Sequence, residues 1–151
     1  MTVSHRTSPL SDMAPATLYA VLRLRVDVFV VEQECAYAEL DGRDLEAGAR
    51  MIWAEEDGEM LATVRVLHDG EDRRIGRVAT AASARGRGIA ADLMRRALVE
   101  CGPRRIRLDA QAHLEHWYAR FGFAVDGEPF VEDAIPHVPM SRPADATVSA
   151  A

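Results

Sequence analysis

The sequence lacks several features that would place it in a special class of protein. It has two cysteines, Cys35 and Cys101, which show no metal-ligand spacing and are too few for a disulfide framework. No apolar run is long enough to cross a membrane, residues 1–10 contain no apolar signal region, and no internal repeat is present. We therefore expect a cytoplasmic protein with reduced thiols, no bound metal and no membrane partner.

Basic charge is also scarce. The 151 residues contain 18 basic and 24 acidic side chains, which gives a formal net charge of −6. This balance argues against nucleic acid as a partner and is compatible with a cationic substrate. The length fits one domain, which we place at residues 1–142, followed by a flexible tail at 143–151. The sequence does not distinguish between a monomer and a homodimer.

Hydrophobic periodicity and turn signals predict elements in the order β-α-β-β-β-α-β-α-β-β, an α/β arrangement with helices packed on a mixed sheet. The first helix has Pro15 in its first turn and Ser11 or Asp12 as its cap. The longest helical pattern begins at Ile89 and stops at Gly102. The remaining segments are expected strands at 2–6, 51–56, 60–68, 75–80 and 105–110, a short helix at 113–120, and two short strands within 123–142.

A glycine-containing loop between a strand and a helix is the most informative segment. The strand ends at Thr80, the loop runs from Arg85 through Gly86, Arg87, Gly88 and Ile89 to Ala90, and the helix follows. The two glycines allow backbone N–H groups to point outward, and the helix N-terminus adds unpaired donors with a partial positive charge. Arginine is suited to bidentate phosphate contacts. The segment therefore predicts a site for the phosphates of a nucleotide-like cofactor.

The spacing also matches a dinucleotide fingerprint. Residues 86–91 read G-x-G-x-x-A, and Asp109 follows about 20 residues later at a strand end. In that fold the first glycine comes directly off the strand, whereas residues 81–84 intervene here. Only 42 residues remain after Asp109, too few for the further β-α units required. A nicotinamide or flavin oxidoreductase is therefore the weaker interpretation.

The loop resembles the cofactor loop of the GNAT acetyltransferases, R/Q-x-x-G-x-G/A, at every fixed position of 85–90. Residues 118–123 match the later Y-x-x-x-G-F motif of the same family. The run 22–33, the residues 41–44 and the residues 132–137 resemble the ElaA-like branch. The resemblance covers about residues 15–142 and implies a mostly antiparallel single-domain GNAT fold with acetyl-CoA as the donor.

This resemblance assigns roles to several residues. Val78, Ala79 and Thr80 would hold the pantetheine arm through backbone hydrogen bonds, and residues 85–90 would hold the phosphates. A backbone N–H near Val78 or Ala79 would polarise the thioester carbonyl, helped by a β-bulge that family members often have. Gln111 stands where many relatives have an asparagine that contacts the pantetheine arm. Glutamine offers the same amide on a longer side chain.

Tyr118 can be read in two ways. It belongs to a stripe at helical spacing with Leu114, Trp117 and Phe121, which is typical of an ordinary core. The family resemblance implies instead that its hydroxyl is the general acid that protonates the departing CoA thiolate.

The general base is less clearly marked. An amine acceptor must lose a proton before it attacks, and acidic residues crowd the segment 32–46. Glu32 is the preferred base because it lies at the end of the run 22–33, and Asp41 is a substrate-side candidate within the same segment. The alternative is a solvated acidic loop. His137 is a second, titratable candidate on the substrate side.

The sequence as a whole predicts an N-acyltransferase that moves an acetyl group from acetyl-CoA directly to a primary amine in a ternary complex. The acceptor is either a small-molecule amine or a protein or peptide amine. The competing hypothesis is a non-catalytic module that binds or senses acyl-CoA, since both proteins would carry the same phosphate loop.

Overall fold

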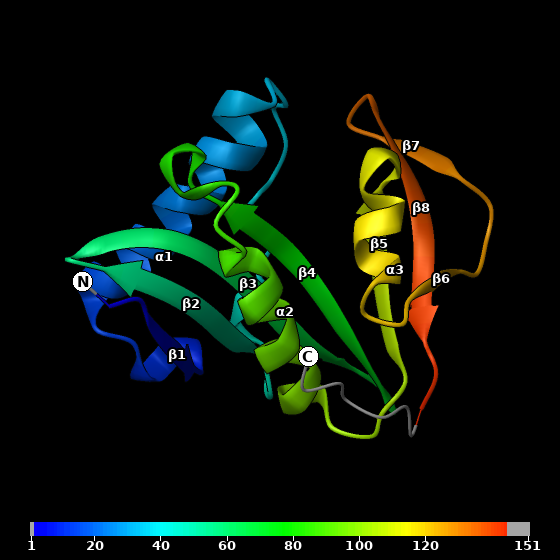
Figure 1. The fold of residues 1–151 in the computed structure, drawn as a ribbon, viewed down its shortest axis with the longest axis horizontal. Coiled ribbons are helices and arrows are strands. Elements are labelled where there is room, and N and C mark those ends of the chain that lie inside the picture. The colour runs from blue at the N-terminus through cyan, green and yellow to red at the C-terminus, as the bar shows by residue number, and fades with distance from the viewer. Residues whose placement is uncertain (1, 145–151) are drawn as a thin grey trace.

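The computed structural model describes residues 2–144, and the expected tail lies outside this range apart from residues 143 and 144. One sheet runs through the molecule in the order β1-β2-β3-β4-β5-β8-β6, with β7 paired to β8 (Figure 1). Its strands are β1 (Ser4–Ser8), β2 (Arg50–Glu56), β3 (Glu59–Asp69), β4 (Asp72–Thr80), β5 (Ile106–Gln111), β6 (Ala124–Val125), β7 (Phe130–Glu132) and β8 (Ile135–Arg142).

The sheet is antiparallel except at its centre. The two central strands, β4 and β5, are parallel and pair only at Arg73 with Ile106 and Arg74 with Arg107. Beyond these two residue pairs the strands diverge, so the sheet opens between them into two halves, as Figure 1 shows. Backbone groups on the facing edges of β4 and β5 therefore have no neighbouring strand over most of the length of β4.

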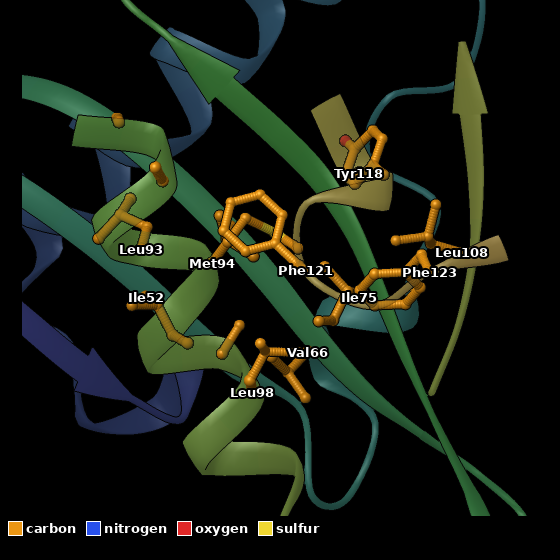
Figure 2. Close-up of a cluster of buried hydrophobic side chains, with 14 of the residues drawn as sticks. Ile52, Val66, Ile75, Leu93, Met94, Leu98, Leu108, Tyr118, Phe121 and Phe123 are labelled. Atoms are coloured by element: carbon orange, nitrogen blue, oxygen red, sulfur yellow. The ribbon is translucent and has the colours of Figure 1, made fainter. Parts of the chain in front are cut away.

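Helices cover both faces of the sheet. The core-facing residues of α2 (Ile89–Cys101), including Leu93, Met94 and Leu98, pack with Ile52 and Val66 on one face (Figure 2). On the opposite face, α1 (Pro15–Val26) packs through Val21 against a second cluster that contains Met51, Trp53 and Leu67. Alternate residues of β2 thus enter different cores, as the two-residue period of a strand requires.

Most predicted elements are confirmed, with informative differences at their ends. The first helix is capped at Ala14, because Ser11 and Asp12 belong to a preceding 3-10 turn. It continues beyond Val26 as a π-helical stretch, Asp27–Glu32. The expected helix at 113–120 is a 3-10 turn followed by α3 (Glu115–Ala119). The C-terminal region forms three strands rather than two. Among residues 2–144, no helix is long and apolar enough to cross a membrane.

A buried group of charges holds the acidic segment against α1 and the sheet. Arg25 is 1% exposed and donates to Glu39 and Asp44, each across 2.7 Å. Burial alone would lower the pKa of Arg25, but its hydrogen bonds to these carboxylates raise it, so the guanidinium stays charged. Removing one partner of such a buried pair costs about 3–5 kcal/mol, since the other charge stays uncompensated. Arg25 therefore fixes the course of the chain through residues 39–44.

Candidate active site

A cleft of about 1210 Å³ occupies the opening between β4 and β5. It passes from the start of α2 through the split in the sheet to the face covered by α1. Its lining includes most of the residues expected from the sequence: Glu32, Asp41, Val78, Thr80, Arg85, Gly86, Gly88, Ile89, Ala90, Gln111, Tyr118 and His137. The structure thus brings residues from distant parts of the chain to one continuous site.

The glycine loop at one end of the cleft has the geometry of an anion site. Gly86 and Gly88 have φ values of 80° and 76°, which glycine adopts without the steric cost that a Cβ would bring. Gly88 is the N-cap of α2 and supplies no side chain to the first-turn N–H groups. The donors of this turn therefore remain available to a phosphate group, and the partial charge of the helix favours it.

The two arginines of the loop point in different directions. Arg85 lines the cleft, and its guanidinium contacts both carboxylate oxygens of Glu32 at 2.6 and 2.7 Å and the Thr80 carbonyl oxygen at 3.2 Å. Arg87 lies outside the cleft lining and pairs with Glu56 at 3.1 Å. Both side chains are engaged within the protein, so the backbone donors and the helix N-terminus are the groups of this loop that are left available to an anion.

Strand β4, which borders the cleft, contains the expected β-bulge in its pairing with β3. Thr63 of β3 pairs with Ala79, whereas Arg65 pairs with Gly76, so two residues of β4 stand opposite Val64. One of these two is Arg77, whose φ of 52° is left-handed. A non-glycine residue in this region costs of order 1–3 kcal/mol. The bulge interrupts the β3 ladder next to Val78 and leaves a β4 residue without its regular backbone partner.

Residues on the two sides of β4 have different surroundings. Val78 and Thr80 line the cleft, but Ala79 is 2% exposed and packs with Leu24 and Val28 on the α1 face. Any contact of Ala79 with a ligand would therefore come from its backbone alone.

Tyr118 is buried on α3 and borders the cleft. Its ring packs edge-to-face on Trp117 and Phe123, and Figure 2 shows its hydroxyl on the side of the ring that faces β4. No group in the described part of the chain hydrogen-bonds this hydroxyl. Burial raises the pKa of Tyr118, so the phenol keeps its proton at neutral pH. The residue therefore belongs to the core and also presents a proton donor to the cleft.

Polar side chains from the end of the π-helical stretch and from β5 and β8 form another part of the cleft wall. The amides of Gln33 and Gln111 hydrogen-bond to each other across 3.3 Å. His137 Nδ1 lies 2.7 Å from the carbonyl oxygen of Ile135, and its ring stacks on Phe130. Because a carbonyl oxygen only accepts, the neutral imidazole carries its proton on Nδ1 and its lone pair on Nε2.

The central carboxylates of the acidic segment are paired within the protein and are not free to bind a cation. Its central carboxylates contact arginines: Glu39 and Asp44 contact Arg25, and Asp41 contacts Arg65 at 2.9 Å and Arg77 at 3.1 Å. Burial alone would raise the pKa of Asp41, but the hydrogen bonds from Arg65 and the Arg43 N–H lower it to about 2. The charge of Asp41 is therefore balanced within the protein.

The expected base Glu32 is held in the same manner. The hydrogen bond from Arg85 lowers the pKa of Glu32, which weakens it as a proton acceptor. Both side chains remain partly exposed at 47% and 43%, so solvent screens this pair.

Several site residues were not singled out from the sequence. Gln33, Cys35 and Tyr37 line the cleft because the π-helical stretch ends beside it. Arg77 was missed because alternation along a strand gives no sign of a left-handed residue. Gly76, its neighbour, was the only local hint of a bulge.

Comparison with known proteins agrees with this geometry. Residues 18–143 match a family model described as "Acetyltransferase (GNAT) domain". The UPF0039 protein Rv2851c of Mycobacterium tuberculosis is 48% identical over 153 residues, covering 98% of each chain. Protein ElaA of Escherichia coli is 39% identical over 139 residues, covering 87% of this chain and 91% of ElaA.

Solved structures show the same similarity. An acyl-CoA N-acyltransferase from Pseudomonas aeruginosa superimposes with a TM-score of 0.89 and 39% identity, over 93% of this chain and 99% of that one. The crystal structure of Escherichia coli ElaA gives a TM-score of 0.88 with 36% identity over the same shares. The chain belongs to the GNAT acetyltransferase family, in its ElaA-like branch. It is an acyl-CoA-dependent N-acyltransferase that uses an acceptor substrate, and the dinucleotide interpretation is set aside.

The glycine loop generates a first prediction, tested with a matched pair of glycines. Gly88 and Gly58 have similar φ values, 76° and 80°, and a Cβ at either would meet nothing within 4 Å. Gly58 lies in the β2–β3 turn, outside the cleft lining. Gly88→Val places a branched side chain where phosphate must approach the backbone. We expect CoA affinity, measured by calorimetry, to fall at least about tenfold, or ~1.4 kcal/mol.

The control variant Gly58→Val carries the same backbone strain and should bind CoA as the parent does. Normal CoA binding by a folded Gly88→Val protein would show that the phosphates are held elsewhere.

Proposed function

We propose that this protein transfers an acetyl group from acetyl-CoA directly to a primary amine within a ternary complex. The observation that supports this most is the continuity of the cleft through the sheet. The phosphate loop, Val78, Tyr118, Gln111 and His137 all line this one cleft. A donor and an acceptor can therefore approach the same point from opposite faces of the sheet.

In this proposal the backbone of β4 binds the donor and also activates it. The pantetheine arm binds along the unpaired edge of β4 at Val78 and Thr80, in the way that an added strand would pair with it. Gln111 lies on the opposite wall of the cleft. The Val78 N–H then donates to the thioester oxygen, where negative charge develops as the amine attacks the carbonyl carbon. The bulge supplies this donor because it removes a β4 residue from the β3 ladder.

Tyr118 completes the transfer. The tetrahedral intermediate collapses by breaking the carbon–sulfur bond, and the electron pair leaves on sulfur. The hydroxyl of Tyr118 donates its proton to this thiolate and recovers one from solvent afterwards. A tyrosine phenol has an ordinary pKa of about 10, and burial raises the pKa of Tyr118 further, so the group still carries its proton when the thiolate forms.

His137 is the proposed base in place of Glu32. Because Nδ1 of His137 contacts the Ile135 carbonyl oxygen, the lone pair on Nε2 remains available to accept a proton. The carboxylate of Glu32, in contrast, already accepts two hydrogen bonds from Arg85. The lone pair on Nε2 of a neutral imidazole can accept a proton from an ammonium group through water. Glu32 then acts on the donor side, where it holds Arg85 beside Thr80.

Direct transfer is supported by the state of the two cysteines. Cys101 lies in the core, where burial raises the pKa of its thiol to about 12, far from a reactive thiolate. Cys35 lines the cleft, but its Sγ lies 3.3 Å from the Asp133 carbonyl oxygen, to which a protonated thiol donates. Neither is placed as a nucleophile.

The proposal is tested by a screen of acetyl-CoA turnover across small amines, polyamines, amino sugars, amino acids and peptides, with free thiol as the signal. The chain contains no lysine, so a protein acceptor can be included without acetylation of lysines on the enzyme. We expect thiol release that depends on one amine class and yields an N-acetylated product by mass spectrometry. Tight acetyl-CoA binding without turnover across the panel would favour the non-catalytic binding module.

Tyr118→Phe separates the proton donor from the packing residue. The substitution keeps the ring, so its contacts with Trp117 and Phe123 persist. Loss of a general acid should lower the maximal rate by about 10²–10⁴-fold. Binding of CoA, which does not need the proton, should remain normal. A maximal rate equal to that of the parent protein would remove Tyr118 from the mechanism.

The base is identified by the pH dependence of kcat/KM for the acceptor found in the screen. In the parent this ratio should fall toward low pH, because the base must be unprotonated to accept the proton. His137→Gln should lower the ratio by about 10²–10⁴-fold and abolish this low-pH limb. Glu32→Gln should retain the limb and change CoA affinity instead. The reverse pattern would return the role of base to Glu32.

A further inference from the structure

Arg77 stands at a backbone position that its residue type disfavours. It has a φ of 52° inside β4, at the bulge opposite Val64, and its neighbour Gly76 is the residue that would adopt this conformation freely. A glycine at position 77 would form the same turn without steric conflict. The arginine must therefore be held in place by its side chain, since its backbone preference opposes the observed geometry.

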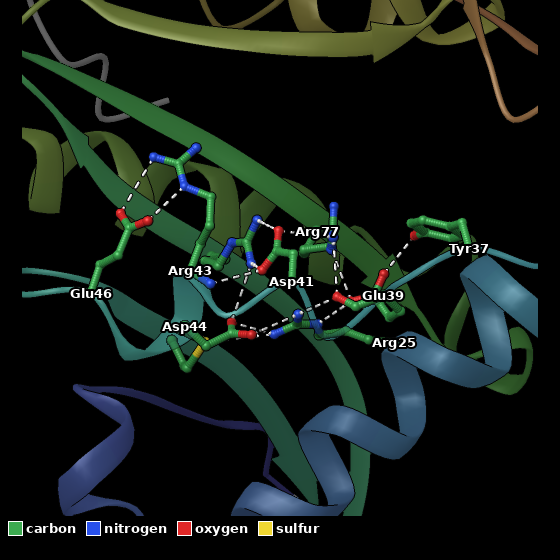
Figure 3. Close-up of polar contacts among 10 residues, drawn as sticks. Arg25, Tyr37, Glu39, Asp41, Arg43, Asp44, Glu46 and Arg77 are labelled. Atoms are coloured by element: carbon green, nitrogen blue, oxygen red, sulfur yellow. Dashed lines mark hydrogen bonds and ion pairs between the residues drawn. The ribbon is translucent and has the colours of Figure 1, made fainter.

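The contacts of the guanidinium supply that restraint, as Figure 3 shows. Arg77 Nε donates to Glu39 Oε2 at 2.8 Å, and Nη2 donates to the Glu39 carbonyl oxygen and to Asp41 Oδ2, both at 3.1 Å. The same group lies over the ring of Tyr37, 5.7 Å from its centroid. Arg77 is thus clamped from three sides by the segment 37–41.

The acceptors are themselves fixed. Glu39 is 3% exposed and also receives hydrogen bonds from Arg25 at 2.7 Å and from the Tyr37 hydroxyl at 2.5 Å. Asp41 is held by both terminal nitrogens of Arg65, at 2.9 and 3.0 Å. Arg25 comes from α1 and Arg65 from β3, so the clamp is anchored to two separate elements of the fold.

We propose that Arg77 is a positioning residue for acyl transfer. Its ion pairs with Glu39 and Asp41 hold the bulge in the left-handed conformation that presents the Val78 N–H to the acyl carbonyl. This inference rests on the proposed role of Val78 as the donor to that carbonyl. It also assigns a use to the acidic segment: its charges fix the oxyanion donor and are not available to attract a substrate.

The test follows the Val78 amide by ¹H–¹⁵N NMR and needs no acceptor. Acetyl-CoA and CoA share every phosphate contact and differ only in the acetyl group. A hydrogen bond to the acetyl carbonyl should move the Val78 amide proton downfield with acetyl-CoA relative to CoA. Arg77→Gly removes both the backbone strain at the bulge and the ion pairs that restrain it. The difference in Val78 amide shift between acetyl-CoA and CoA should then fall to less than half of its value in the parent. CoA affinity should stay within about twofold, because the phosphate loop is untouched.

Two further variants make the outcome decisive. Arg107→Gln removes another strand arginine, paired with Asp72 at 3.1 Å outside the cleft lining, and should leave the Val78 response intact. Asp41→Asn removes the ion pair of Asp41 with Arg77 and should give a Val78 response between those of the parent and Arg77→Gly. This variant also tests the proposal if Arg77→Gly does not fold. A full response in folded Arg77→Gly, or in Asp41→Asn alone if Arg77→Gly is unfolded, would overturn the role of Arg77.

The two proposals fail in different ways. If the parent shows no difference at Val78 between acetyl-CoA and CoA, then the donor role of Val78 is wrong, and the role of Arg77 falls with it. If the parent shows the difference and the Arg77 and Asp41 variants keep it in full, only the positioning role is overturned.

Discussion

The central constraint of this structure is that β4 and β5 stop pairing after two residues. Backbone N–H and C=O groups are obligatory hydrogen-bonding groups, and burying them without partners is costly. A sheet that opens in its interior must therefore admit water or a ligand with polar groups along its length. The opening is stable because α2 and α1 cover opposite faces and bury the side chains of the strands on either side of it. The cleft is therefore a direct consequence of the fold, because it forms where β4 and β5 separate.

The second constraint is electrostatic, and it acts on the wall of the cleft. Three arginines, Arg25, Arg65 and Arg77, face three carboxylates, Glu39, Asp41 and Asp44, so the charges within this group balance. The segment that carries the carboxylates has little regular structure of its own. Its path is instead set by charge-assisted hydrogen bonds to α1, β3 and β4, which have strict geometry and resist displacement. Such a network gives a loop the rigidity that a binding wall needs.

The sequence predicted those parts of the molecule whose cause is local. The range of α2 agrees at both ends, because Gly88 and Gly102 mark its limits in the sequence itself. The loop at 85–90 is likewise encoded by its own residues. The positions of Tyr118 and Gln111 beside the cleft followed from the family motif, whose elements the fold brings together.

The parts that the sequence did not predict depend on distant partners. Arg77 and Glu39 are 38 positions apart, and Arg85 and Glu32 are 53 apart, so no spacing rule links them. Glu32 was preferred as a base for its place in a motif, but a carboxylate's basicity depends on the charge beside it in space. The acidic segment was a candidate source of the base for the same reason, since its arginine partners lie elsewhere in the chain.

In the proposed mechanism the donor and the acceptor bind to different parts of the cleft, and this division explains which half of the site could be predicted. The donor side uses backbone groups of the glycine loop and β4, which require particular conformations and therefore particular residues such as Gly86 and Gly88. The acceptor side uses side chains from the end of the π-helical stretch and from β8, where many residue types fit the same backbone. A motif can thus identify an acyl-CoA donor, whereas in the proposed mechanism the acceptor is selected by the shape and hydrogen bonding around Gln33 and His137. The same division explains how one fold can keep a single donor and serve different acceptors.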